Sequence, residues 1–373
     1  MTYIKNGVLL LPEGEAINTV LAFDTHIRGL IQESQIGDGE VIDAKGKLVS
    51  PGLTDLHIHG FMGDDASDGD AEGLDRISKN LIKNGVTSFL PTTMTLSYAE
   101  LERAFDVARG LRGNESGSSI LGINAEGPFI AEGRKGAQDG KYIKPVDADF
   151  LIRHSDIIRL TTVAPETEGA IEAIKKVKEK TNVVVSVGHS DASGEQTKAG
   201  FDAGITHATH LFNAMSPLGH RNLGVAGAAL TDDRVSCELI ADTFHVNPDL
   251  YKMLYTLKGD KLVLITDCMR AGGMPDGEYT LGGQRVTLRG IECRLDDGVI
   301  AGSVLTLNKA VYNFKKHTGL SYAEAIRLAS ANPCAAIGQT DRGSIEVGKV
   351  ADVVIFDYDF NAEKVFVGGK EKL

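Results

Sequence analysis

The sequence predicts an α/β protein in which a closed (β/α)8 barrel of the TIM type stands beside a small β-domain. Two observations carry this prediction: short apolar, β-branched runs recur eight times through the middle of the chain, and amphipathic helical patterns separate most of them. Strands that are apolar on both faces are typical of parallel sheets covered by helices, and eight such strands close as a barrel. A doubly wound open sheet is the competing architecture.

The eight runs are the expected barrel strands. They occupy residues 53–57, 86–90, 120–125, 158–163, 183–187, 206–210, 237–241 and 262–267. Two of the helical faces between them are formed by Leu74, Ile77, Leu81 and Ile82, and by Leu101, Ala104, Phe105 and Ala108. Residues 97–100 and 321–324 match the S-x-x-E capping box, which predicts a helix start at each, and Asn84-Gly85 predicts a helix end.

The two ends of the chain have a different pattern from the middle. Residues 1–50 contain strand-like pieces broken by Gly-rich turns, and residues 343–373 repeat this pattern. Because the termini of a domain often lie close together, we expect both ends to pair into one discontinuous β-sandwich domain. Residues 51–342 then form the barrel, with a Gly- and charge-rich insertion near 271–301 after the eighth strand.

Composition and charge exclude several classes of function. The 373 residues carry 51 acidic and 39 basic side chains, a net charge of −12, which repels duplex DNA and acidic membrane surfaces. No apolar run approaches the roughly 20 residues that cross a bilayer, and the chain starts without a signal-like segment, so we expect a cytoplasmic protein. The four cysteines form no CxxC pair, which favours reduced thiols.

Polar side chains gather where the predicted strands end. These are His57, His59, Glu126, His189, His210, His245 and Asp267. In a closed barrel such strand ends converge on one mouth, where the active sites of this fold lie. A single histidine at a strand end is more often structural than a ligand, and a lone Asp there is commonly a turn residue. Five of the ten histidines lie at strand ends, which favours a shared site over five separate structural roles.

The spacing of these histidines carries further information. His57 and His59 are two residues apart, so both imidazoles lie on the same side of a strand and can face one cation. Imidazoles with one carboxylate are the usual ligands of an open catalytic zinc or iron site. His207 shares a predicted strand with His210, but the odd spacing points it to the opposite face.

Several motifs together identify a resemblance. PGLTDLHIHG, AEGPF, VGHS, THLFNAM, GVAGA, IADTFHV and LITD occur in this order, and GKVADVVIFD follows near the end. On these motifs the whole chain resembles the N-acetylglucosamine-6-phosphate deacetylases of the amidohydrolase superfamily. The resemblance implies a metal-dependent hydrolase that converts N-acetyl-D-glucosamine 6-phosphate to D-glucosamine 6-phosphate and acetate, in amino-sugar catabolism and cell-wall recycling. It also implies a homodimer.

The resemblance also implies roles for individual residues. Glu126, His189 and His210 would bind the principal divalent metal, zinc or iron, and His57 and His59 would complete a second site bridged by Glu126. Asp267 would act as general base and acid on the water and the leaving amine. The phosphosugar would be held by Gln138 near the acetyl carbonyl, His245 at the sugar, and Asn213, Ala214 and Arg221 at the phosphate.

Alternative interpretations remain open at this point. Without the motif, Arg221 would be taken as a solvated loop residue, although a protein of charge −12 needs a local cation to accept a phosphate. A cyclic-amide hydrolase or deaminase is disfavoured because residues 161–166, after the fourth strand, include no lysine for a metal bridge. A metal-free scaffold is disfavoured because the ligand set shows no gap.

Overall fold

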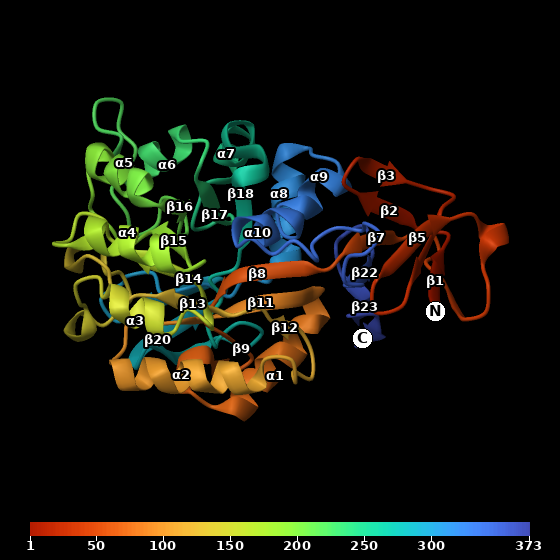
Figure 1. Ribbon diagram of the computed structural model, residues 1–373, viewed down its shortest axis with the longest axis horizontal. Helices are drawn as coiled ribbons and strands as arrows, with labels where there is room; N and C mark the ends of the chain where they lie inside the picture. The colour runs from red at the N-terminus through yellow and green to blue at the C-terminus, as the bar shows by residue number, and fades with distance from the viewer.

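A computed structural model describes all 373 residues, and eight parallel strands form the barrel (Figure 1). In chain order they are β8 (Leu53–Ile58), β11 (Val86–Thr93), β13 (Ile123–Glu126), β14 (Ile158–Val163), β15 (Val184–Val187), β16 (Ile205–Ala208), β17 (Ser236–Ile240) and β18 (Leu262–Ile265). Each strand pairs with the next, and an isolated parallel bridge between Ile58 and Cys268 joins the last to the first. The sheet is therefore a barrel, as predicted, and not a doubly wound open sheet.

A helix follows every barrel strand. They are α1 (Ala71–Leu81), α2 (Tyr98–Leu111), α3 (Ala148–Arg153), α4 (Ala170–Lys180), α5 (Gly194–Ala203), α6 (Gly224–Thr231), α7 (Tyr251–Lys258) and α8 (Leu307–Thr318), with α9 (Tyr322–Arg327) and α10 (Ala331–Ala336) after them. Both predicted capping boxes are present, at the starts of α2 and α9. Gly85, with φ 75°, ends the short turn after α1, as expected.

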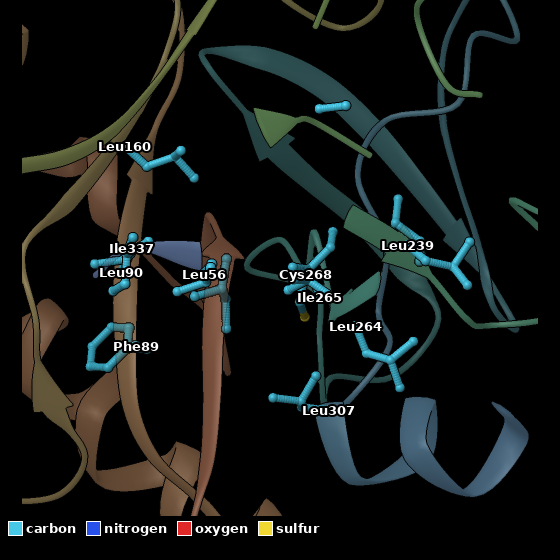
Figure 2. Close-up of a cluster of buried hydrophobic side chains, with 14 of the residues drawn as sticks. Leu56, Phe89, Leu90, Leu160, Leu239, Leu264, Ile265, Cys268, Leu307 and Ile337 are labelled. Carbon is cyan, nitrogen blue, oxygen red and sulfur yellow. The ribbon is translucent and has the colours of Figure 1, made fainter. Parts of the chain in front are cut away.

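The barrel strands and the helices around them share one large apolar core. Figure 2 shows part of this cluster of buried side chains, contributed by several strands, among them Leu56 on β8, Leu160 on β14 and Leu239 on β17. Nearly every residue of the barrel strands is buried, because the helices cover the outer face and side chains fill the inner one. All four cysteines are buried in this fold, and none forms a disulfide.

Three strand predictions were wrong at their ends, each for a backbone reason. The third predicted strand is split into β12 (Ser119–Ile120) and β13, because Gly122 adopts a φ of 147° between them. The sixth ends at Ala208 and the eighth at Ile265, since His210 (φ 29°) and Asp267 (φ 52°) have left-handed backbone. These two functional candidates therefore lie on turns beyond the strands.

Strands from both ends of the chain form a β-sandwich beside the barrel. One sheet has the order β5-β4-β1-β6 and the other the order β24-β23-β22-β7-β2-β3. Their bounds are β1 (Thr2–Lys5), β2 (Val8–Leu11), β3 (Gly14–Ala16), β4 (Val20–Phe23), β5 (Ile27–Ile31), β6 (Glu40–Asp43), β7 (Leu48–Pro51), β22 (Val353–Phe356), β23 (Ala362–Val367) and β24 (Lys370–Glu371). The antiparallel pair β7–β22 joins the two ends, and both termini lie in this part of the molecule (Figure 1).

The central strands of the six-stranded sheet, β7 and β22, are buried on both faces. Along β22, Val353 and Ile355 belong to the sandwich core, whereas Val354 and Phe356 belong to the barrel core. This alternation follows the two-residue period of a strand, so one sheet seals the sandwich and also packs against the barrel. The predicted domain limits, 1–50 with 343–373 and 51–342, stay a prediction.

The segment between β18 and α8 forms a small antiparallel sheet of its own. Its strands are β19 (Gly277–Leu281), β20 (Gln284–Arg289) and β21 (Glu292–Leu295). A two-stranded ribbon, β9 (Gly60–Phe61) with β10 (Asp64–Asp65), follows the first barrel strand. No helix has the length and apolar character needed to cross a membrane.

Candidate metal centre

A cavity of about 350 Å³ opens at the carboxyl ends of the barrel strands. Its polar lining includes His59, Glu126, His189, His210 and Asp267, which the sequence placed at strand ends. Leu281 from β19, together with Val299 and Ile300 after β21, covers one side of it. Residues at or just beyond the ends of five barrel strands therefore meet at one mouth, as a closed barrel requires.

One group of ligand atoms centres on Glu126, the last residue of β13. Its Oε1 lies 3.0 Å from Nε2 of His189 and 2.8 Å from Nε2 of His210. The two imidazole nitrogens are 3.1 Å apart. We call Glu126, His189 and His210 the first ligand group, and their three ligand atoms lie close enough together to share one ion.

A second group of ligand atoms contacts the same carboxylate. Nε2 of His59 is 3.2 Å from Oε2 of Glu126, and Nε2 of His57 is 3.4 Å from Oε1. Oδ1 of Asp267 lies 3.4 Å from His57 Nε2 and 3.2 Å from His59 Nε2. His57, His59 and Glu126 form the second ligand group. The two-residue spacing thus brings both imidazoles to one point, as predicted.

The outer nitrogens of these imidazoles show that a cation fits the cluster. Nδ1 of His59 lies 3.2 Å from the Thr92 carbonyl oxygen, and Nδ1 of His189 lies 2.8 Å from that of Arg134. A carbonyl oxygen only accepts, so each Nδ1 carries a hydrogen, and a neutral ring in this orientation directs the lone pair of Nε2 inward. The Nε2 atoms of neighbouring rings are 3.1–3.4 Å apart, and their lone pairs repel one another unless a proton or a metal ion lies between them.

The electrostatics of the cluster lead to the same result. Burial alone would lower the pKa of His57, but Glu126 and Glu238 outweigh it and hold this pKa well above its ordinary value. Burial would also lower the pKa of His59, but Asp267 and Glu126 outweigh burial and raise this pKa to about 9. The buried carboxylates thus create a negative field that calls for positive charge, which a divalent cation also supplies.

The backbone at three of these residues is unusual. His189, His210 and Asp267 have φ values of 47°, 29° and 52°. Non-glycine residues in this left-handed region cost about 1–3 kcal/mol each and cluster at functional sites. At each position the strand has just ended, and the left-handed turn occurs as the side chain enters the mouth.

Sequence reasoning missed Glu238, the middle residue of β17. Its side chain is fully buried, with Oε2 3.0 Å from Nδ1 of His57 and Oε1 3.1 Å from Nε2 of His207. The backbone N–H of His210 also donates to Oε2, at 3.0 Å. The available signal was a carboxylate inside an otherwise apolar strand, since such a group is rarely buried unless it is paired.

His207 also departs from its prediction. The expected alternation between His207 and His210 does not hold, because β16 ends at Ala208 and His210 lies on the following turn. His207 instead contacts the same buried carboxylate, Glu238, whose other oxygen contacts His57.

Two residues expected at the acetyl and sugar groups line the cavity. Nε2 of Gln138 donates to Glu126 Oε2 at 2.6 Å, and its Oε1 accepts from the Thr95 N–H at 2.6 Å. Gln138 is therefore fixed beside the ligand groups. Nδ1 of His245 lies 2.6 Å from Oδ2 of Asp242, which leaves Nε2 of this cavity-lining ring free for another partner.

The residues expected at the phosphate are only partly gathered. Asn213 and Ala214 line the cavity, on the turn that follows His210. The Asn213 N–H already donates to the His210 carbonyl oxygen at 3.0 Å, whereas the Ala214 N–H has no protein acceptor. Arg221 lies on an exposed loop and is not among the residues that line the cavity.

The arrangement can be compared with known proteins. Residues 48–372 match the family model described as the amidohydrolase family. The chain belongs to the amidohydrolase family. Amidohydrolases are metal-dependent enzymes, and in this member the shared carboxylate Glu126 and four imidazoles supply ligand atoms for a metal ion.

Relatives within the amidohydrolase family share one kind of name. N-acetylglucosamine-6-phosphate deacetylase of Bacillus subtilis is 40% identical over 322 residues, 84% of this chain and 81% of that protein. N-acetylgalactosamine-6-phosphate deacetylase of Escherichia coli O157:H7 is 38% identical over 336 residues, 88% of this chain and 89% of that protein.

A solved structure is similar over its whole length. It is a mutant N-acetyl-D-glucosamine-6-phosphate deacetylase from Mycobacterium smegmatis in complex with N-acetyl-D-glucosamine-6-phosphate. It has 30% sequence identity and a TM-score of 0.92, and the match covers 100% of this chain and 99% of that one.

Proposed function

We propose that this amidohydrolase cleaves the acetamide of N-acetyl-D-glucosamine 6-phosphate, giving D-glucosamine 6-phosphate and acetate. The observation that carries the proposal is Glu126, whose carboxylate joins two groups of imidazoles at the bottom of a cavity of about 350 Å³. The relatives named above support the same substrate class, since all three are deacetylases of N-acetylhexosamine phosphates.

The two ligand groups have separate tasks in this proposal. Glu126, His189 and His210 hold the principal ion, and His57 and His59 hold a second one that shares Glu126. Zinc and iron both suit this set of imidazole and carboxylate donors. A divalent cation at this position supplies Lewis-acid activation of water and of the amide carbonyl.

Asp267 moves the proton. Its carboxylate is buried at the cavity beside the second ligand group, where it accepts a proton from the attacking water. The water oxygen bonds to the acetyl carbon, and the carbon–nitrogen bond then breaks as Asp267 delivers the proton to the nitrogen. This transfer is needed because an unprotonated amide nitrogen leaves poorly.

The remaining cavity residues hold the sugar. The Asp242 carboxylate fixes His245 through Nδ1, so that Nε2 is directed to a sugar hydroxyl. Gln138 stands beside Glu126, where its second N–H can reach the acetyl oxygen. The Ala214 N–H and the Arg221 side chain would hold the phosphate, beside Asn213, whose side-chain amide already donates to the carbonyl oxygens of His210 and Leu211. Arg221 would add a positive charge to that of Arg134, which lines the cavity.

A second candidate substrate is N-acetyl-D-galactosamine 6-phosphate. It is favoured by one specific observation, the 38% identity to a deacetylase named for that sugar. The two substrates differ only in the orientation of one hydroxyl, so the same ligand groups serve either. A dimeric assembly stays a prediction.

The test is acetate release by metal-loaded protein from three compounds. These are the 6-phosphates of N-acetylglucosamine and N-acetylgalactosamine, and unphosphorylated N-acetylglucosamine. We expect N-acetylglucosamine 6-phosphate to have the highest kcat/KM. The kcat/KM of the unphosphorylated sugar should be about 10–10²-fold lower, since a charge-assisted phosphate contact is worth about 1.5–3 kcal/mol. A preference for the galacto compound selects the second candidate.

Matched arginine variants locate the phosphate contact. Arg221→Ala should raise KM for the phosphorylated sugar and leave the unphosphorylated one unchanged. Arg234→Ala is the control, because Arg234 is an exposed residue already paired with Asp232 and Asp202. Absence of acetate release from either sugar phosphate by metal-loaded wild-type protein would refute the proposed function.

A further inference from the structure

Glu238 lies behind the metal centre, where no substrate reaches it. Its side chain is fully buried in β17, yet both oxygens are used: Oε1 contacts His207, and Oε2 contacts His57 and the backbone of His210. Burying a carboxylate is expensive, and three hydrogen bonds from imidazole and backbone groups offset that cost. A position that only filled the core would be occupied more cheaply by an apolar side chain.

The partners of Glu238 belong to different ligand groups. His57 is a member of the second ligand group, and His210 is a member of the first. Glu126 joins the two groups from the cavity side, through their Nε2 atoms. Glu238 joins the same two residues from the opposite side, through Nδ1 of one and the backbone N–H of the other.

The contact with His57 fixes which ring nitrogen faces the cavity. A backbone N–H can only donate, so Oε2 of Glu238 accepts from His210, and as a carboxylate oxygen it also accepts from Nδ1 of His57. With the hydrogen on Nδ1, the lone pair of Nε2 is directed at the shared site beside Glu126 and Asp267. Outer contacts of this kind orient a ligand ring and raise its basicity.

We propose that Glu238 is a positioning residue that sets the affinity of the second ligand group for its ion and ties that group to the turn carrying His210. The inference rests on the proposed function only in requiring that both ligand groups bind metal. It predicts that loss of Glu238 weakens the second ion before the first. His57 loses the acceptor that orients its ring, whereas His210 loses only a backbone contact and His189 and Glu126 keep their contacts.

Three variants separate orientation from packing. Glu238→Met keeps a similar volume but removes every acceptor. Glu238→Gln keeps one neutral acceptor oxygen, and His207 can accommodate the amide because its Nδ1 has no other partner and can take the hydrogen. His207→Gln is the control, since its amide N–H can still donate to Oε1 while the contact with His57 is untouched.

The measurement is zinc binding without substrate, by metal content per chain and by competition with a chelator, while circular dichroism checks the fold. We expect two ions per wild-type chain and a second-ion Kd raised about 10–100-fold in Glu238→Met, the usual effect of losing an outer contact. Glu238→Gln should fall between wild type and Glu238→Met, and His207→Gln should match wild type. Cobalt-substituted protein should lose the absorption of one ion only.

Several results would overturn the inference. The inference is wrong if the wild-type chain binds only one ion. It is also wrong if folded Glu238→Met binds the second ion as tightly as wild type, or loses both ions together. If Glu238→Met does not fold, an unchanged second-ion Kd in Glu238→Gln decides against it. Acetate release is measured separately, so a chain that binds two ions without deacetylating the sugar contradicts only the proposed function.

Discussion

The two ligand groups share Glu126, but different kinds of backbone carry their histidines. His57 lies within the regular strand β8, and His59 follows directly after its last residue. His189 and His210 lie beyond the ends of β15 and β16, on left-handed turns with φ values of 47° and 29°. The second group is therefore placed by the sheet itself, whereas the first depends on turns that must be held by their contacts.

The outer contacts of the rings differ in the same way. In the second group, His57 is held by Glu238 and His59 by the carbonyl of Thr92, both on barrel strands. In the first group, His189 is held by the carbonyl of Arg134, in a single 3-10 turn (Glu132–Arg134) outside the barrel strands, and Nδ1 of His210 has no partner. Preorganised ligands bind more tightly than loosely held ones, so the first group relies more on Glu126 and on the ion itself.

Removing the shared carboxylate should have the largest effect. In Glu126→Ala both groups lose an oxygen ligand, and we expect the loss of both ions. Acetate release should fall by about 10³-fold or more, because charge stabilisation by the ion is worth several kcal/mol. Metal analysis and kinetics on the same preparation check this. Retention of either ion would show that Glu126 is not a ligand that both groups need.

Asp267→Asn tests a residue that contacts only one group. Asp267 lies beside His57 and His59. Acetate release should fall by about 10²–10⁴-fold, the usual worth of a positioned acid or base, while the ion of the first group stays bound. Turnover at the wild-type rate would rule out the proton-transfer role.

Paired histidine variants compare the groups directly. His59→Asn removes a direct ligand, so it should weaken only the second ion, by more than the roughly 10–100-fold effect of losing an outer contact, and lower turnover less than His189→Asn does. His189→Asn removes a ligand of the principal ion and should lower turnover by about 10²-fold or more. Equal losses in the two variants would show that the principal ion is not confined to the first group.

The smallest expected effect is the change in the stability of the fold when the metal is removed. An ion at 100 times its Kd stabilises the fold by about 2.7 kcal/mol, so chelation should lower Tm by several degrees and added zinc should restore it. Amide hydrogen exchange should accelerate at the turns carrying His189 and His210 more than in β8. Faster exchange in β8 would reverse the order of rigidity inferred for the two groups.

Sequence reasoning succeeded where the information is local. The capping box at Ser97 and Glu100 needs only residues three apart, and the shared face of His57 and His59 needs only the two-residue period of a strand. It failed for His207, because the alternation argument assumed a strand that in fact ends at Ala208.

Contacts between distant strands were beyond such reasoning. Glu238 meets His57 across the barrel, and Gln138 meets Glu126 from a loop, and no short-range pattern specifies either pair. Arg221 shows the reverse case, since the resemblance places it at a phosphate whereas the described cavity does not include it. Register between strands far apart in sequence decides such encounters, and it is set by tertiary packing.

The pairing of β7 with β22 has a consequence for synthesis of the protein. Pro51 is made early and Val353 near the end, yet they are neighbours in one sheet. On the ribosome, one edge of β7 must therefore stay unpaired until almost the whole polypeptide has emerged. Pairing between strands so far apart in sequence is slow, and an unpaired strand edge can associate with other chains in the meantime. The β-sandwich is therefore completed only when the last strands of the chain pair with the first.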